Sequence, residues 1–163
     1  MNSALLCHFY LNVERVMIGL VQRVRQASVT VDGRKIAAIG QGILVLVGIE
    51  KQDGWSQAEK LAQKVLNYRL FSDSEGKMNL NVGQIGGEVL LVSQFTLAAN
   101  TSKGNRAGFD PAMAPTLAEP LFARFCDYVC SLHPATQMGQ FGADMQVALI
   151  NDGPVTFSLQ VSP

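Results

Sequence analysis

Histidine and cysteine are scarce in this sequence of 163 residues, and their scarcity excludes several kinds of catalytic site. A serine or threonine nucleophile needs a base within hydrogen-bond distance, and the only histidines are His8 and His133. The cysteines, Cys7, Cys126 and Cys130, are odd in number and lack zinc-ligand spacing, so we expect buried free thiols in a reducing cytoplasm. Since a Gly-x-Ser-x-Gly segment is also missing, we expect no conventional triad and no catalytic metal.

Excess charge and long apolar runs are missing too. Thirteen basic residues balance thirteen acidic ones, so the formal net charge is zero. Broad, salt-driven binding of nucleic acid needs many Lys and Arg side chains, so any contact with RNA should be confined to a small region. The longest apolar runs, 43–47 and 89–92, are far shorter than a membrane span and are typical of buried strands. We therefore expect a cytoplasmic protein that does not bind a membrane.

What remains is the pattern of a small domain with several strands. Apolar and β-branched residues predict strands at 18–24, 43–49, 89–96, 145–150 and 155–161. Asp32-Gly33 favours a type I′ turn and therefore a hairpin around it. The almost unbroken apolar run 43–49 indicates a strand buried on both faces.

Two segments have helical periodicity. The first, 56–69, is predicted to begin with a capping box of Ser56 and Glu59. The second begins at Thr116 with a capping box to Glu119, and Pro120 falls in its predicted first turn. Its buried stripe is expected to consist of Leu121, Phe122, Phe125, Val129 and Leu132. The order of elements predicts a mixed α/β single domain, in which a β-sheet or barrel is covered by two helices.

Two further segments lie outside this regular pattern. Residues 1–16 lack both a basic segment and a long apolar stretch, so we interpret them as an extension of doubtful function. The domain itself then occupies residues 17–163. Residues 98–114 contain glycine and proline among polar residues and predict a long loop, a kind of segment that is often functional.

The functional signal comes from two short motifs, Ser93-Gln94-Phe95-Thr96 and Asn151-Asp152-Gly153-Pro154-Val155-Thr156. Together with the segments 69–73, 76–81 and 143–147, they resemble the D-aminoacyl-tRNA deacylase family (the D-tyrosyl-tRNA deacylase type) over residues 17–161. The resemblance implies hydrolysis of the ester between a D-amino acid and the 3′ end of tRNA, and of glycyl-tRNA mischarged on tRNA-Ala. It also implies a homodimer without a cofactor, in which the active site lies at the subunit interface.

The first motif allows two mechanisms. Thr96 is the obvious candidate nucleophile, but no base lies near it in the sequence, and its hydroxyl could simply bond to the backbone. His133 is expected to be solvated or bound to a carbonyl. In the alternative, the N–H groups of Phe95 and Thr96 and the amide of Gln94 form an oxyanion hole, and the tRNA 2′-OH assists as an internal acid or base. Phe95 either walls the pocket or fills the core.

The second motif, whose predicted binding residues are Asn151, Gly153, Pro154 and Thr156, also has two interpretations. Its turn-forming residues could simply connect two strands. The resemblance implies instead a cis Gly153-Pro154 peptide that enters the partner's active site. Its carbonyl groups would hold the substrate ammonium, so that an L-side chain meets protein and a D-side chain points to solvent. Arg23 either orients this motif or is an ordinary solvated residue.

Two other functions stay open. One is a related aminoacyl-tRNA proofreader for a mischarged L-residue or glycine, against which Ser93 and the Gly153-Pro154 step argue. The other is a non-catalytic RNA- or DNA-binding module on the same fold, against which the zero net charge and the intact motifs argue. Lys103 and Arg106 in the long loop are either contacts for tRNA phosphates or ordinary surface charges.

Overall fold

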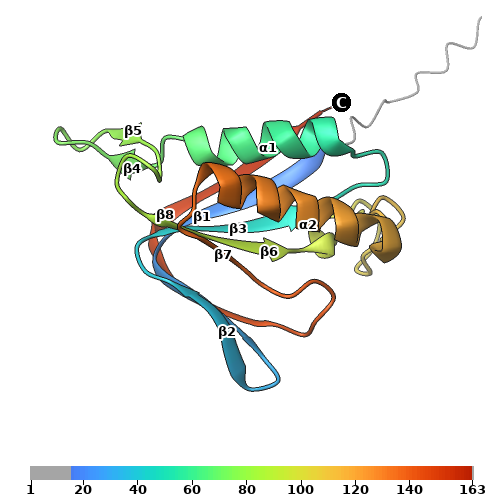
Figure 1. The fold of residues 1–163 in the computed structure, drawn as a ribbon. Helices are drawn as coiled ribbons and strands as arrows, with labels where there is room; N and C mark the ends of the chain where they lie inside the picture. Colours follow the sequence, from blue (N-terminus) through green and yellow to red (C-terminus); the bar gives the residue numbers. More distant parts are fainter. Residues whose placement is uncertain (1–15, 163) are drawn as a thin grey trace, which may run out of the picture.

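The computed structural model describes residues 16–162, in which a curved sheet is covered on one side by two helices (Figure 1). The strands are β1 (Met17–Val31), β2 (Arg34–Ile39), β3 (Gly42–Gly48), β4 (Phe71–Ser72), β5 (Met78–Leu80), β6 (Glu88–Ser93), β7 (Thr136–Met138) and β8 (Gln146–Val161). The helices are α1 (Trp55–Asn67), the 3-10 helix η1 (Phe95–Ala98) and α2 (Pro115–Leu132). The predicted mixed α/β single domain is confirmed, whereas residues 1–15 of the predicted extension lie outside the described residues.

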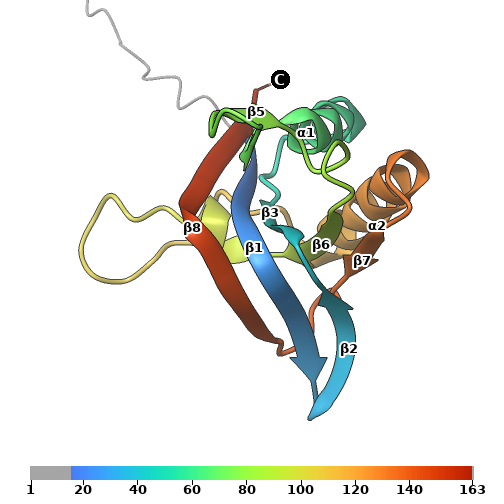
Figure 2. The same ribbon diagram turned by 90° about the vertical axis from the view of Figure 1, so that its left-hand side faces the viewer.

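The long strand β1 organises a six-stranded sheet. Its first part pairs antiparallel with β3 and its second part with β2, while β8 pairs with it on the other side along most of its length. Beyond β3 the sheet continues with β6 and β7 in parallel register. Figure 2 shows β1 and β8 running side by side as the sheet bends, so that it approaches a closed barrel.

Both faces of the central strands are buried. On β3, Ile43 and Val45 belong to the core beneath the helices, whereas Leu44 belongs to a second core inside the curved sheet. On β6, Leu91 and Leu90 are divided between the same two cores. Successive side chains of a strand point to opposite faces, and each face here meets its own apolar layer. The prediction that 43–49 is buried on both faces is therefore confirmed.

α1 packs on the sheet through a face of helical spacing, made of Ala58, Leu61, Ala62 and Val65. The helix begins at Trp55, with Gly54 as its N-cap residue. The side chain of Gln57 accepts the N–H of Gly54 at 2.9 Å, which satisfies a donor that the helix leaves free. The predicted capping box of Ser56 and Glu59 is therefore wrong, because the helix starts before Ser56.

α2 begins at Pro115, a suitable first helical residue because it has no N–H to leave unsatisfied. The residue before it makes no side-chain cap hydrogen bond, so the predicted capping box of Thr116 and Glu119 is wrong. Pro120 lies inside the helix, beyond the first turn, on the exposed side. The buried face consists of Ala118, Phe122, Phe125, Cys126 and Val129. Leu132, predicted to be buried, is half-exposed.

Two strands differ from the predicted ones in ways that shape the site. β6 ends at Ser93 and the chain turns into η1, so the strand predicted at 89–96 is too long. The strands predicted at 145–150 and 155–161 are the single strand β8, whose pairing with β1 becomes irregular near Val24. The second motif lies at that irregularity. Across residues 16–162, no helix combines the length and the apolar character that crossing a membrane would need.

Candidate active site

The first motif lies where β6 ends. Ser93 is paired with Val47 of β3, and the N–H of Gln94 donates to the Val47 carbonyl at 2.8 Å. The chain then enters η1, whose first residues are Phe95 and Thr96. The first N–H groups of a helix have no partner inside it, and neither of these two donates a hydrogen bond within residues 16–162. Two adjacent main-chain donors are therefore free at the end of the strand.

A glycine of β3 brings this strand close to η1. A Cβ atom added to Gly48 would lie 2.8 Å from Leu97 Cβ and 3.4 Å from the Gln94 carbonyl oxygen. Only glycine fits such an approach without displacing η1. Gly48 is therefore part of what places the first motif, and the interruption of an apolar strand by glycine is a signal that sequence analysis passed over.

The hydroxyl of Thr96 has an amide for its partner. The Gln94 side-chain amide donates a hydrogen bond to Thr96 Oγ1. No carboxylate or imidazole is hydrogen-bonded to this hydroxyl within the described part of the chain. His133 instead pairs with the Gly87 carbonyl oxygen at 2.9 Å, which confirms the carbonyl-bound interpretation. A serine or threonine nucleophile needs a neighbouring base, and this arrangement does not supply one.

Phe95 forms an exposed aromatic surface at the start of η1. Its side chain is 59% exposed, so the interpretation that it fills the core is wrong. Its ring packs against that of Phe109, with the centroids 5.1 Å apart. Phe109 belongs to the long loop that follows η1, and the ring contact joins this loop to the first motif.

The second motif is held by the side chain of Asn151. Its amide donates to the carbonyl oxygens of Arg23 and Val155 at 3.0 Å each, and its own oxygen accepts the N–H of Val155 at 3.4 Å. A Cβ atom added to Gly153 would collide with the N atom of Val155 and with Asn151 Oδ1, so the turn admits only glycine there. The Gly153-Pro154 peptide is cis, as the resemblance implies.

Arg23 fastens this turn to the rest of the domain. Its Nε donates to the Asp152 carbonyl oxygen at 2.8 Å, and its Nη1 donates to the Leu70 carbonyl oxygen at 2.7 Å. The same guanidinium lies 3.4 Å from the Asp152 carboxylate, and the side chain is only 16% exposed. The interpretation of Arg23 as an ordinary solvated residue is therefore wrong, since its largely buried guanidinium links Asp152 of the turn to Leu70.

The remaining motif residues face solvent. Gly153 and Pro154 are exposed, so the turn presents its backbone at the molecular surface. Thr156 is paired with Gln22 through the backbone. Its side chain is exposed and makes no hydrogen bond within residues 16–162. The structure thus gives a geometric task to Asn151 and Gly153 but none to the hydroxyl of Thr156.

The two motifs lie far apart in one chain. In the sheet register, Ser93 is aligned with Val47 of β3 and Gly19 of β1. The second motif is aligned instead with Arg23 of β1, whose partner Ile43 lies at the beginning of β3. Strand geometry makes this a separation of roughly 13 Å along the strands and roughly 14 Å across them. Figure 1 shows the end of β6 and the bend of β8 at opposite ends of the sheet. A single chain therefore does not bring the motifs together.

A buried carboxyl in the turn before α1 was not predicted from the sequence. Asp53, in the turn between β3 and α1, accepts the N–H of Glu50 at 2.7 Å, and its other oxygen has no partner in the described structure. Burial raises the pKa of Asp53 to about 6, against the hydrogen bond from Glu50, which lowers it. The same turn holds the long loop, because the N–H of Lys51 donates to the Pro111 carbonyl at 3.0 Å.

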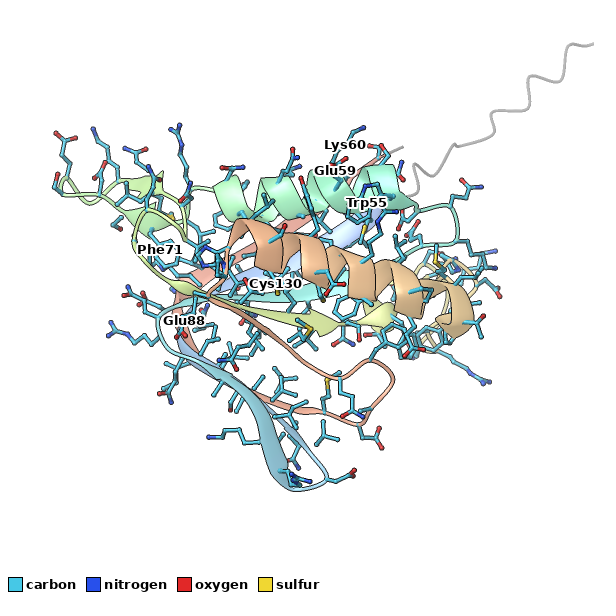
Figure 3. All side chains as sticks on the ribbon, in the orientation of Figure 1. Trp55, Glu59, Lys60, Phe71, Glu88 and Cys130 are labelled. Atoms are coloured by element: carbon cyan, nitrogen blue, oxygen red, sulfur yellow. The ribbon has the colours of Figure 1, made fainter. Side chains whose placement is uncertain are left out.

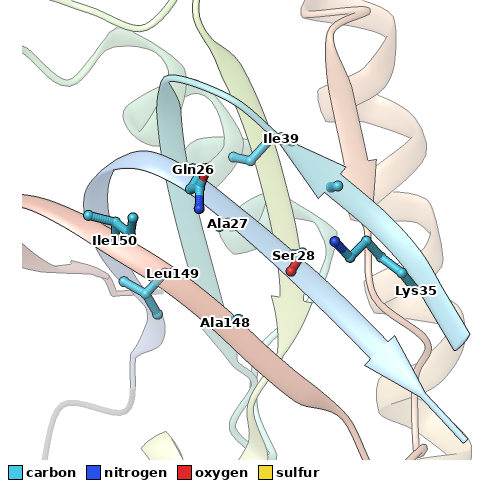
Figure 4. Close-up of a pocket in the computed structure, with 9 residues that line it drawn as sticks. Gln26, Ala27, Ser28, Lys35, Ile39, Ala148, Leu149 and Ile150 are labelled. Carbon is cyan, nitrogen blue, oxygen red and sulfur yellow. The ribbon is translucent and has the colours of Figure 1, made fainter. Parts of the chain in front are cut away.

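The surface of the described residues has two notable depressions. One of about 640 Å³ lies beside η1 and is lined by Glu50, Lys51, Asp110, Pro111 and residues 97–102. The other, of about 270 Å³, lies on β1, β2 and β8 and is lined by Lys35, Leu149 and Ile150 among others (Figure 4). Neither is lined by a residue of either motif, and the lining of the first includes Leu97, directly after Thr96.

Metal and thiol chemistry find little support in the described residues. No three His, Cys, Asp or Glu side chains gather within residues 16–162. Cys126 is a buried free thiol, and burial raises its pKa to about 12, so it stays protonated. Cys130 is free but only half-buried, so the predicted burial holds for Cys126 and not fully for Cys130. Cys7 lies outside the described residues.

These features define a class of protein, a single-domain α/β fold that presents free main-chain donors, rather than a nucleophile and base, at a strand end. The family model described as D-Tyr-tRNA(Tyr) deacylase matches residues 20–160. Relatives named D-aminoacyl-tRNA deacylase from Dichelobacter nodosus and Citrobacter koseri are 69% and 58% identical over 145 residues, 89% of this chain and 100% of each relative. The chain therefore belongs to the D-Tyr-tRNA(Tyr) deacylase family.

Solved structures share the same fold. One described as c-Myc DNA Unwinding Element Binding Protein is 43% identical, with a TM-score of 0.85, and the match covers 90% of this chain and 99% of that one. Another, described as a probable eukaryotic D-amino acid tRNA deacylase, matches with a TM-score of 0.80 over 90% of this chain and 100% of that one. At 14% identity this second likeness concerns the fold alone.

Proposed function

We propose that this protein hydrolyses the ester of D-aminoacyl-tRNA and releases the free D-amino acid and tRNA. The observation that carries the proposal is the pair of free N–H groups of Phe95 and Thr96 at the end of β6. An aminoacyl ester is already activated, so hydrolysis requires mainly a positioned water and donors for the developing oxyanion. Oxyanion donors of this kind contribute about 10²–10³ in rate each.

The tRNA itself supplies the proton transfer in this proposal. Thr96 is bonded to an amide and has no base beside it in the described structure, so it is not the nucleophile. The ribose 2′-OH next to the ester acts as an internal acid or base, and the Gln94 amide serves as a further donor. Ser93 ends β6 and places the donors of η1. No metal or cofactor takes part.

The complete site forms between two copies of the chain. The separation of the motifs within one chain leaves the first motif without Gly153 and Pro154, and both lie exposed at the surface. A two-fold homodimer places each copy's second motif against the first motif of its partner. Arg23 and Asn151 hold the turn in its shape, so that it enters the partner's site as a rigid unit.

Chiral selection follows from this shared site. The carbonyl groups of Gly153 and Pro154 hold the α-ammonium of the substrate, while the donors of the first motif hold its ester carbonyl. With both groups held, an L-side chain collides with protein and a D-side chain points to solvent. Glycine has no side chain to be rejected, so glycyl-tRNA mischarged on tRNA-Ala is also a substrate. Thr156 completes the surface around this turn.

Residues 17–163 form the catalytic domain in this proposal, and residues 1–16 are an extension that the reaction does not need. The matched region of the family model, 20–160, lies entirely within this domain. The protein works in the cytoplasm, where its tRNA substrate is present and where the free thiols of Cys126 and Cys130 stay reduced.

A second candidate function is a nucleic-acid-binding module on the same fold. It is favoured by the similarity to a structure described as a DNA unwinding element binding protein. A related proofreader of different specificity is the other alternative. Hydrolysis of D-Tyr-tRNA, of a mischarged L-aminoacyl-tRNA and of glycyl-tRNA separates the three. The proposed enzyme cleaves D-Tyr-tRNA, a proofreader of different specificity cleaves only a mischarged L-aminoacyl-tRNA or glycyl-tRNA, and a binding module cleaves none of them.

Mixing two variants tests whether the site is shared. Gln94→Ala removes a donor of the first motif, and Gly153→Ala disrupts the second, so each homodimer should be nearly inactive. After the mixture is unfolded and refolded, statistical pairing gives heterodimers with one intact site, and about a quarter of wild-type activity should return. If the mixture stays as inactive as its components, the site does not form across two chains.

A further inference from the structure

The loop 99–111 stands away from the sheet next to the first motif, as Figure 2 shows. Its base is closed by a reciprocal pair of hydrogen bonds between Asn100 and Gly108, at 2.7 and 3.0 Å. The Asn100 side chain accepts the N–H and the hydroxyl of Ser102 at 3.0 and 2.7 Å, and Gly104 turns the tip with a positive φ of 64°. The loop is therefore an ordered projection whose two ends are joined by hydrogen bonds.

This projection is attached to the residues of the proposed site. The Phe109 ring packs against Phe95, and the N–H of Ala99 donates to the Thr96 carbonyl at 3.2 Å. On its other side, the Pro111 carbonyl accepts the N–H of Lys51. The base of the loop is thus fastened next to η1, which carries the free donors.

The composition of the loop indicates what it binds. Residues 101–107 are all exposed and include no aromatic or large apolar side chain, so Arg106 is the only residue among them of a type that commonly anchors protein interfaces. Their only charged members are Lys103 and Arg106, and neither forms an ion pair within residues 16–162. The carboxylates of Glu50 and Asp110 line the depression at the base of the loop.

We propose that Lys103 and Arg106 bind phosphate groups of the tRNA acceptor end while the terminal ester lies at the first motif. This inference rests on the proposed function and extends it to a subsite for the RNA strand. A protein of zero net charge cannot attract RNA over its whole surface, so two unneutralised cations beside the site supply the local attraction. Long Lys and Arg side chains suit a strand that carries one phosphate per nucleotide.

The test compares Lys103→Gln/Arg106→Gln with the control Arg34→Gln/Lys60→Gln, which removes the same charge from exposed positions. Arg34 lies in the β1–β2 hairpin, and Figure 3 shows Lys60 on the outer side of α1. Each protein is assayed on D-Tyr-tRNA and on the 3′-D-tyrosyl ester of adenosine, which has no phosphate. We expect the loop variant to raise KM for the tRNA on the order of tenfold, with kcat and the adenosine ester unaffected.

Salt gives a second readout. For single strands the logarithm of affinity falls by about 0.7 per phosphate contact for each tenfold increase in salt. Removing two contacts should therefore reduce the salt slope of kcat/KM on tRNA by about 1.4. Between 50 and 200 mM salt the wild type should lose about sevenfold more activity than the loop variant, while the control keeps the wild-type slope.

Three results would overturn this inference. The loop variant could match the control on tRNA, or it could lose activity equally on tRNA and on the adenosine ester, which would mean that the loop shapes the catalytic site. It could also lose its dimeric state in light scattering, which would make the loop an interface with a second copy.

Binding of uncharged tRNA is measured on the same proteins. If the wild type cleaves neither ester, the proposed function fails, while equal tRNA affinities of loop variant and control refute the subsite separately.

Discussion

The two motifs are built in opposite ways, although both lie at the molecular surface. The first depends on regular structure, since β6 ends at Ser93 and η1 begins with two N–H groups that no residue of the described chain accepts. The second depends on side chains, since Asn151 and Arg23 bond to carbonyl groups within and around the turn. In the first motif two main-chain N–H groups lack hydrogen-bond partners within the described residues, whereas in the second motif side chains satisfy carbonyl groups in and around the turn. The difference teaches that the first offers donors to a ligand, whereas the second offers a rigid shape.

The largest effect is expected at Gly153, where the turn has room for a hydrogen atom but not for a methyl group. In Gly153→Ala the new Cβ would collide with Val155 and Asn151, so the turn must move. A displacement of about 1 Å at a reacting site costs on the order of 100-fold in rate, and kcat/KM on D-Tyr-tRNA should fall accordingly. The control is Gly83→Ala, an exposed position where the nearest atom would lie 3.4 Å away. Equal activities of the two variants would contradict the requirement for glycine in this turn.

Removing the fastening of the turn should have the next largest effect. Arg23→Ala removes two charge-assisted hydrogen bonds, to Asp152 and Leu70, and should lower the unfolding free energy in urea by about 2 kcal/mol. It should also reduce the ratio of D- to L-deacylation. The matched control is Arg25→Ala, which removes an exposed ion pair of the same Asp152 and should change stability by less than about 0.5 kcal/mol. An Arg23→Ala protein as stable and selective as the control would refute this role.

The burial of Asp53 can be tested by pH. The folded state raises the pKa of Asp53 from 3.8 to about 6, so it binds the proton more tightly than the unfolded chain does. This contribution is fully favourable below about pH 4 and is lost as the pH rises through 6. Asp53→Asn has no such titration, so its stability relative to wild type should increase between about pH 4 and 6. Parallel melting curves of the two proteins across this interval would contradict the assignment.

The smallest effect is expected at the residue that looks most like a nucleophile. Thr96→Ala removes the acceptor of the Gln94 amide but leaves the main-chain donors in place. Single-turnover hydrolysis of D-Tyr-tRNA should therefore fall by less than about threefold, whereas Gln94→Ala should cost about 100-fold. A trapped acyl-enzyme on Thr96, or loss of activity to background in a folded protein, would restore Thr96 as the nucleophile.

Sequence patterns were informative where one local cause dominates. The burial of β3 on both faces follows from its almost unbroken apolar run, and the buried face of α1 follows from apolar residues at helical spacing. Helix starts were predicted less well. The capping pattern of Ser56 and Glu59 competes with that of Gly54 and Gln57, and such local preferences differ by only about 1 kcal/mol, so packing chooses between them.

The sequence by itself determined the family, the strands of the core and the glycine at the tight turn, because each follows from residue types at short spacing. The tertiary structure alone decided that Arg23 meets Asp152, 129 residues away, and Leu70, 47 residues away. It also decided that Asp53 is buried and that the two motifs are level with different parts of β3. The physical reason is that sheet register sets these distances, and register arises from the packing of all strands together.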